Sequence, residues 1–119
     1  MIGTDIVEVE RVRRLIRRYD HRFLDKVYTA GEQEYCNEST NRYERFAGRF
    51  AAKEAIRKAL QPYTSAKYIP FLHIEILPDS KGVPIPVLTT NVDFQSAVGE
   101  IAVSISHERR YAVAFAMVT

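Results

Sequence analysis

The centre of the sequence reads Phe46-Ala47-Gly48-Arg49-Phe50-Ala51-Ala52-Lys53-Glu54-Ala55-Ile56-Arg57-Lys58-Ala59-Leu60. Residues that favour helices, such as alanine, lysine and glutamate, dominate this stretch. The polar residues at 37–41 separate it from what precedes it, and Pro62 ends it because proline cannot continue a helix. We therefore predict a long helix over Arg42–Leu60.

After this helix the sequence alternates between apolar and polar residues, as β-strands do. We predict strands at 73–77, 83–88, 101–106 and 111–118. Turn-forming residues at 79–82 join the first two strands, and residues 107–110 form a hairpin loop between the last two. Since helices come early and strands late, the predicted fold is α+β, with helices packed on a small antiparallel sheet.

Before the central helix, a short strand at 2–7 leads into an amphipathic helix that ends near Tyr19. At about 100° per residue its apolar residues fall on one side. The arginines Arg11, Arg14 and Arg18 cluster on the other side. Thr29, with Glu32 three residues on, has the pattern of a capping box, which predicts another short helix after Thr29.

Composition limits the classes of protein to consider. The chain has 119 residues, 46% of them hydrophobic, which is enough for one domain over residues 1–119. The net charge of +2 is not that of a chain built around nucleic acid. No apolar stretch approaches the ~20 residues of a membrane-spanning helix, and the N-terminus lacks the layout of a signal peptide.

The single cysteine, Cys36, cannot form an internal disulfide, and this suits a reducing compartment. It lies in a polar run with no histidine or second cysteine nearby, so we do not expect a catalytic thiol. The expected location of the protein is the cytoplasm.

Glu54 and Lys58 are four residues apart and therefore share one face of the predicted helix. The simpler interpretation is an ion pair in contact with solvent. However, Ala47, Phe50 and Ala51 lie on the same side, one and two turns earlier. This mixture of small, aromatic and charged residues favours a packed helix whose polar groups face a cleft.

Asp5 ends a short strand just before the arginine-rich helix. It has two interpretations of about equal weight, an N-cap for that helix or a functional carboxylate. An aspartate and a glutamate from distant segments can together hold Mg²⁺, which prefers oxygen ligands and leaves room for water and substrate phosphates. A nearby lysine would then neutralise charge on a phosphate.

Taken together, these segments resemble the holo-acyl-carrier-protein synthases, the small stand-alone phosphopantetheinyl transferases. The resemblance spans nearly the whole chain. It is carried by motifs in matching order and spacing: Gly3-Thr4-Asp5-Ile6-Val7-Glu8, Phe23-Leu24-Asp25-Lys26-Val27-Tyr28-Thr29, Phe46-Ala47-Gly48-Arg49-Phe50-Ala51-Ala52-Lys53-Glu54-Ala55 with Lys58-Ala59, Ile74-Glu75-Ile76 before Gly82-Val83-Pro84, and Ser104-Ile105-Ser106-His107-Glu108.

This resemblance implies a homotrimer with active sites at the subunit interfaces. It implies that Asp5 and Glu54 hold Mg²⁺ against the diphosphate of coenzyme A. The serine hydroxyl of an apo acyl carrier protein would attack the phosphorus attached to the pantetheine. Adenosine 3′,5′-bisphosphate would leave, with Lys58 offsetting charge or donating a proton. An ordered water or a carboxylate would take the serine proton.

The resemblance also gives roles to residues outside this centre. Arg11, Arg14 and Arg18 would dock the acidic carrier protein, unless they are simply the solvated face of a structural helix. Arg49, Lys53 and His107 would contact the phosphates of coenzyme A, although an ordinary hairpin residue is an equal interpretation of His107. The carrier served, whether for fatty-acid or polyketide synthesis, is left open.

One segment departs from the family pattern, because Gln61-Pro62 follows Leu60 where the family has a glycine-rich turn. Glycine allows close backbone approach to a phosphate, whereas proline removes a donor. This departure keeps open a degenerate paralogue that binds coenzyme A or carrier protein without transfer. A third alternative is a module whose basic helix binds nucleic acid or an anionic membrane, but it leaves Asp5, Glu54 and Lys58 without a role.

Overall fold

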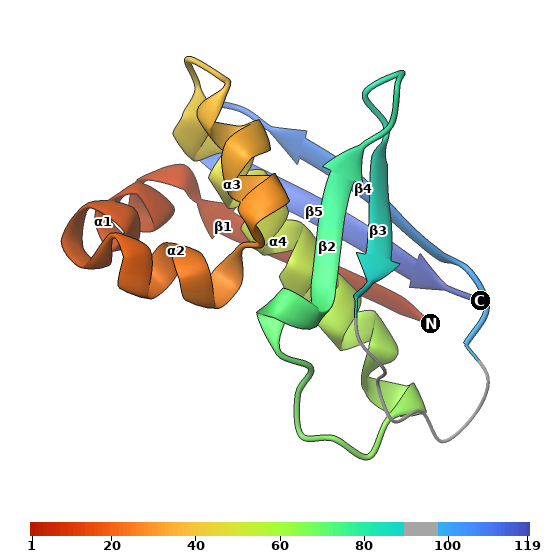
Figure 1. Ribbon diagram of the computed structural model, residues 1–119. Helices are drawn as coiled ribbons and strands as arrows, with labels where there is room; N and C mark the ends of the chain where they lie inside the picture. Colours follow the sequence, from red (N-terminus) through yellow and green to blue (C-terminus); the bar gives the residue numbers. More distant parts are fainter. Residues whose placement is uncertain (90–97) are drawn as a thin grey trace.

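The structure is a computed structural model that describes residues 1–89 and 98–119. Strand β1 leads into three short helices and the long helix α4, and the remaining strands follow (Figure 1). The elements are β1 (Ile2–Glu8), α1 (Val9–Tyr19), α2 (His21–Val27), α3 (Ala30–Asn37), α4 (Arg42–Leu60), the 3-10 turns η1 (Gln61–Tyr63) and η2 (Phe71–His73), β2 (Ile74–Pro78), β3 (Pro84–Leu88), β4 (Ile101–His107) and β5 (Tyr111–Val118).

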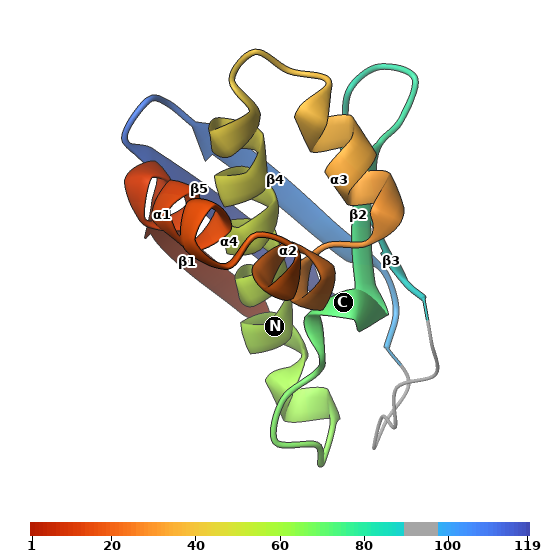
Figure 2. The same ribbon diagram turned by 60° about the vertical axis from the view of Figure 1, so that its left-hand side comes forward.

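Within the described residues, the strands form two antiparallel sheets. One has three strands in the order β1-β5-β4, and the other is the hairpin of β2 and β3. Helix α4 lies across one face of the three-stranded sheet, and α1 and α3 pack against α4 on its other side (Figures 1 and 2). The β2–β3 hairpin lies beside β4. Helix α4 is therefore the element around which the rest of the protein is arranged.

Small residues let α4 approach the sheet closely. Three of the β5 residues that face the helix are Ala112, Ala114 and Ala116, all buried. On β1 the helix-facing residue Gly3 has no side chain, and a Cβ atom there would overlap the carbonyl oxygen of Ala55. This close contact fixes β1 along α4, so that Asp5, two residues later on the same face of the strand, lies beside the helix.

The opposite face of the three-stranded sheet is uncovered and carries several large apolar side chains. The side chains that point away from α4 include Ile2, Ile6, Phe115 and Met117, which are 70%, 65%, 55% and 51% exposed. Exposed apolar residues that are contiguous on one sheet face mark an interaction surface.

Most of the expected elements are confirmed. The fold is α+β, α4 has the predicted bounds, and Thr29 and Glu32 form the predicted capping box at the start of α3. Strand β2 begins one residue later than expected because residue 73 ends η2 instead. The predicted turn between β2 and β3 is present, with Asp79 Oδ1 accepting the backbone N–H groups of Lys81 and Val83.

Helix α2 was missing from the expectation. Asp20, with its positive φ of 48°, ends α1 and starts α2 almost at once, so the two helices have no loop between them that the sequence could mark. The sheet also divides into two, where a single small sheet was expected. No helix in the described part of the chain is both long and apolar enough to span a bilayer.

Candidate active site

Asp5 and Lys58 meet where β1 passes the C-terminal half of α4. Lys58 Nζ donates to Asp5 Oδ1 at 3.1 Å and to the backbone carbonyl of Thr4 at 2.9 Å. The Asp5 side chain is 18% exposed and that of Lys58 is 54% exposed, so the pair opens to solvent. Asp5 is not an N-cap, because Glu8 occupies that position of α1. The N-cap interpretation of Asp5 is therefore wrong.

Glu54 lies one helical turn before Lys58 on α4. Its Oε1 accepts a hydrogen bond from Arg57 Nη1 at 2.6 Å, and the side chain is 28% exposed. The ion pair between Glu54 and Lys58, which was the simpler interpretation, is not formed, since each of these residues has another partner. Glu54 and Lys58 instead line a hollow of about 320 Å³, together with Arg57, Gln61 and Tyr68.

The donor chemistry of this cluster fits a hard divalent cation. No group of three or more His, Cys, Asp or Glu side chains suited to a metal is found among residues 1–89 and 98–119. Mg²⁺ does not need one, because it is usually held by one or two carboxylates while waters and substrate phosphates complete its shell. Asp5 supplies a carboxylate from β1 and Glu54 one from α4, and Lys58 of α4 is bonded to Asp5. Both carboxylate side chains reach solvent.

The Lys53 side chain points into the core, whereas it was expected to reach a coenzyme phosphate. Its side chain has no exposed area, and its ammonium group pairs with Glu32 Oε1 at 2.6 Å. It also donates to the carbonyls of Val27 and Phe71, at 2.7 and 3.1 Å. Burial lowers the pKa of Lys53, and the carboxylate of Glu32 opposes that shift. The expected contact of Lys53 with a coenzyme phosphate does not agree with this position, because α4 turns Lys53 towards the core and Glu54 towards solvent.

Arg49 is also turned inward and is 6% exposed. Its Nε donates to the carbonyl of Ile76 at 3.2 Å, and its guanidinium lies over the Tyr35 ring, 4.5 Å from the centroid. Within one chain Arg49 therefore holds β2 and α3 on α4 and does not extend to the hollow beside Glu54.

His107 ends β4 near the other end of α4. Its Nδ1 lies 3.0 Å from Oε1 of Glu44, in the first turn of the helix, and the ring is 37% exposed. Glu44 and Glu54 are ten residues apart, which is about 15 Å along a helix. The structure therefore does not bring His107 to the Asp5–Lys58 pair of the same chain.

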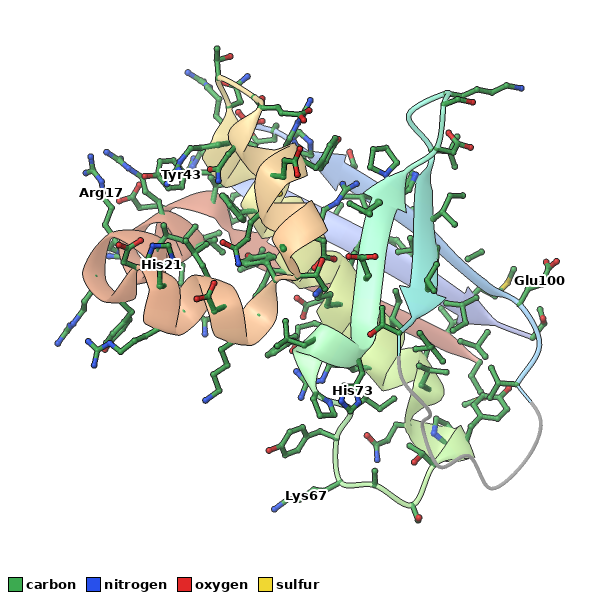
Figure 3. The ribbon with its side chains drawn as sticks, viewed as in Figure 1. Arg17, His21, Tyr43, Lys67, His73 and Glu100 are labelled. Carbon is green, nitrogen blue, oxygen red and sulfur yellow. The ribbon has the colours of Figure 1, made fainter. Side chains whose placement is uncertain are left out.

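The arginines of α1 lie on the surface as expected. Arg11, Arg14 and Arg18 are exposed, whereas Val9, Val12 and Ile16 on the opposite side are buried. Figure 3 shows Arg17 of the same helix pointing away from the body of the protein, as Lys67 does at the opposite end. The predicted amphipathic character of α1 is confirmed.

The segment Gln61-Pro62, where the sequence departs from the family pattern, forms the 3-10 turn η1. Gln61 lines the hollow, and its Nε2 donates to the carbonyl of Ala66 at 3.3 Å. Pro62 occupies one of the first positions of the turn, where a backbone donor is not needed for the turn itself. Helix α4 is thus followed by a 3-10 turn that contains no glycine.

Sequence reasoning missed two residues of the cluster. Arg57, three residues after Glu54, pairs with that glutamate, and its guanidinium lies over the rings of Phe71 and Tyr68. The spacing of Arg57 from Glu54 was an available signal, because residues three apart are neighbours on a helix. No pattern in the sequence pointed to Tyr68, which lies on an irregular loop.

Comparison with known proteins gives the same family over nearly the whole chain. The family model described as the 4′-phosphopantetheinyl transferase superfamily matches residues 1–116. The holo-[acyl-carrier-protein] synthase of Halothermothrix orenii is 47% identical over 117 residues, covering 96% of this chain and 92% of the relative. That of Chlamydia caviae is 45% identical, covering 98% of this chain and 93% of the relative.

Solved structures agree with the sequence relatives. The Helicobacter pylori holo-[acyl-carrier-protein] synthase in complex with coenzyme A has a TM-score of 0.84 at 31% identity, covering 100% of both chains. The Bacillus anthracis enzyme in complex with CoA (3′,5′-ADP) has a TM-score of 0.76 at 32% identity, covering 98% of this chain and 93% of the other. With this fold, and with a carboxylate–lysine cluster at the junction of β1 and α4, the chain belongs to the 4′-phosphopantetheinyl transferase superfamily.

Proposed function

We propose that this protein is a holo-[acyl-carrier-protein] synthase, which transfers the 4′-phosphopantetheine moiety of coenzyme A to a serine of an apo acyl carrier protein. Relatives that carry this name match nearly the whole chain, and both of the solved structures described above hold coenzyme A or a part of it. The observation that carries the proposal is the contact of Lys58 with Asp5, next to Glu54 and on the edge of an open hollow.

Lys58 is placed to receive a phosphate. An ammonium group has three donors, and the bonds to Asp5 and Thr4 use two of them. The third is available to an oxygen of the coenzyme A diphosphate, because more than half of the side chain is exposed. A charge-assisted bond there stabilises the negative charge that develops on the leaving phosphate.

Asp5 and Glu54 are the proposed Mg²⁺ ligands. When bound, Mg²⁺ would offset the charge of the diphosphate and hold it in a fixed orientation. The carboxylates come from a strand and a helix that pack tightly at Gly3, so their positions are set by the rigid part of the fold.

The reaction forms one P–O bond and breaks another. The serine oxygen of the carrier protein bonds to the phosphorus that bears the pantetheine, and the bond from that phosphorus to adenosine 3′,5′-bisphosphate breaks. The serine proton goes to a carboxylate or to an ordered water, and the departing phosphate is stabilised by Lys58. Such a transfer requires positioning and charge neutralisation more than covalent chemistry from the protein.

The exposed arginines of α1 are the proposed docking surface for the carrier protein. Arg11, Arg14 and Arg18 present positive charge on one side of a helix that follows β1 directly, and β1 carries Asp5. Complementary charge raises the rate of encounter with an acidic partner. Replacing Arg14 with glutamate is expected to raise the KM for carrier protein while leaving the KM for coenzyme A within about twofold.

We also propose a homotrimer with active sites at the subunit interfaces. The uncovered apolar face of β1 and β5, with Ile6 and Phe115 at its centre, is a surface that a second copy would cover. An interface site would also bring His107 to the coenzyme phosphates, a contact that it lacks within its own chain. Light scattering is expected to give three times the 13.7 kDa of one chain, and Phe115→Glu is expected to dissociate the assembly.

The proposed unit of activity is a single domain over residues 1–119, and the proposed compartment is the cytoplasm. Cys36 is buried and free of any disulfide, which suits a reducing environment. A role in fatty acid synthesis is proposed on the same family assignment, with polyketide synthesis as the alternative.

Mass spectrometry of an apo carrier protein tests the central proposal. After incubation with this protein, coenzyme A and Mg²⁺, the carrier is expected to gain one phosphopantetheine group. Glu54→Gln and Asp5→Asn are expected to lower the rate by at least about 100-fold. Glu10→Gln is a matched control, because Glu10 also pairs with an arginine three residues on, but on α1. Its rate is expected to stay within about twofold.

Other outcomes identify the alternatives. Calorimetric binding of coenzyme A without any change in carrier mass, for several carrier types, would favour the degenerate paralogue. A salt-dependent shift with DNA or anionic vesicles, and none with carrier protein, would favour the basic binding module.

A further inference from the structure

Arg57 occupies the carboxylate that the proposed function needs for a cation. Its Nη1 donates to Glu54 Oε1 at 2.6 Å, and the two side chains are only 18% and 28% exposed. The pair borders the same hollow as Lys58. Arg57 has no part in the transfer described above, so its position over Glu54 needs a separate explanation.

A guanidinium and a divalent cation cannot both make full use of this carboxylate. Arg57 Nη1 takes a lone pair of Glu54 Oε1, which a bidentate cation would also use, and two positive charges a few ångströms apart repel each other even on different oxygens. Binding of a cation at Glu54 therefore either displaces Arg57 from the carboxylate or proceeds against the positive charge of its guanidinium.

Two aromatic rings also contact the Arg57 guanidinium. It lies over the Phe71 ring, 4.1 Å from the centroid, and over the Tyr68 ring, 5.2 Å from the centroid. These aromatic contacts favour a cation through the ring quadrupole and do not depend on Glu54. Both rings come from the segment that follows Gln61-Pro62, where the chain departs from the family pattern.

We propose that Arg57 is an internal competitor for the Mg²⁺ ligand Glu54. Without the metal, Arg57 neutralises Glu54. When Mg²⁺ arrives with coenzyme A, the aromatic contacts retain the guanidinium while the carboxylate changes partner. Metal binding in this protein is consequently weaker than the same ligands would give without Arg57. The inference rests on the proposed function, because it takes Glu54 as a metal ligand.

The test is a titration of Mn²⁺, followed by electron paramagnetic resonance, in the presence of coenzyme A and with coenzyme A alone as the blank. Arg57→Gln is expected to bind Mn²⁺ about two- to fivefold more tightly than the unmodified protein, the range that loss of one partly exposed ion pair allows. Arg57→Lys keeps the charge, and its Kd for Mn²⁺ is expected to equal that of the unmodified protein.

Controls separate this effect from general changes in charge and stability. Arg13→Gln removes an arginine that pairs with a glutamate three residues earlier on α1, and its Kd for Mn²⁺ is expected to be unchanged. Arg57→Met keeps an apolar stem against the aromatic rings and replaces the glutamine variant if circular dichroism shows that the latter is unfolded.

An equal or weaker affinity for Mn²⁺ in the neutral Arg57 variants would overturn the competition, as would an Arg57→Lys protein as tight as Arg57→Gln. Glu54→Gln tests separately whether Glu54 is a metal ligand. If that variant binds Mn²⁺ like the unmodified protein, or if no variant binds Mn²⁺, the assignment of Glu54 as a ligand fails and this inference with it.

Discussion

Replacing Lys53 with methionine tests whether this lysine holds the fold together or binds substrate. Its ammonium group is fully buried and contacts Glu32, Val27 and Phe71, which belong to α3, α2 and η2. Methionine keeps the length and volume of the side chain but removes the charge and the three donors. Glu32 then remains buried without its cation.

The expected loss of stability depends on the hydrogen bonds that Glu32 keeps when Lys53 is replaced. Breaking a buried ion pair by removing one partner costs about 3–5 kcal/mol. Glu32 keeps two backbone donors, from Thr29 at 2.9 Å and Ile76 at 2.8 Å, which places the expected loss near the lower end. The carbonyls of Val27 and Phe71 also lose their shared donor. A loss of about 3–4 kcal/mol is a large fraction of the 5–15 kcal/mol that stabilises a typical domain.

Urea denaturation at a fixed protein concentration measures this loss, since assembly into oligomers would otherwise shift the midpoint. Lys58→Met is the matched control, because Lys58 lies on the same helix but is 54% exposed. That variant is expected to lose less than about 1 kcal/mol of stability and most of its transferase activity. In Lys53→Met, the KM for coenzyme A of the folded fraction is expected to stay within about twofold.

The opposite pattern would refute this reasoning. If Lys53→Met is as stable as the unmodified protein to within about 1 kcal/mol but its KM for coenzyme A rises about tenfold, then Lys53 contacts the coenzyme. The expectation drawn from the sequence, that Lys53 binds a coenzyme phosphate, would in that case be correct.

Further predictions concern close packing, capping and the thiol. Gly3→Ala places a Cβ atom against the Ala55 carbonyl and is expected to cost about 2–3 kcal/mol; a melting temperature unchanged by calorimetry would contradict the tight contact of β1 with α4. Thr29→Ala removes the cap of α3 and the hydrogen bond to Glu75, for an expected loss of about 1–2 kcal/mol in chemical denaturation. Thr29→Ser is the control, and a loss equal to that of the alanine variant would argue against the capping role. Burial raises the pKa of Cys36 to about 12, so alkylation by iodoacetamide at about pH 8 is expected to be slow in the folded protein and fast in urea. Labelling of the folded protein at the rate of a free thiol would show that Cys36 is accessible.

The sequence predicted the elements well where their signals are local. The bounds of α4, the capping box of α3 and the turn at Asp79 depend on residues within a few positions of each other. Helix α2 was not predicted because a single residue, Asp20, separates it from α1, and seven residues are too few to show a helical period.

The sequence predicted the position of some candidate site residues better than that of others. Asp5, Glu54 and Lys58 were selected from their residue pattern, and the resemblance to a family then gave them roles. In the structure Lys58 contacts Asp5, and it lines the same hollow as Glu54. Lys53 was expected to contact the coenzyme because it is adjacent to Glu54 in the motif, but successive helical residues point about 100° apart. Only the packing of α3 and η2 against α4 shows that Lys53 is the one that faces inward.

By itself, the sequence determined the order of helices and strands and the family, since periodicity, caps and motifs are properties of neighbouring residues. The tertiary structure alone decided which charged groups are partners. Lys58 meets Asp5 across 53 positions and Glu32 accepts the Ile76 N–H across 44, because both pairings depend on how closely β1, α3 and β2 pack on α4. The pair of Arg57 and Glu54 is local, three positions apart on α4, but the contacts of the Arg57 guanidinium with the rings of Tyr68 and Phe71 depend on the tertiary fold.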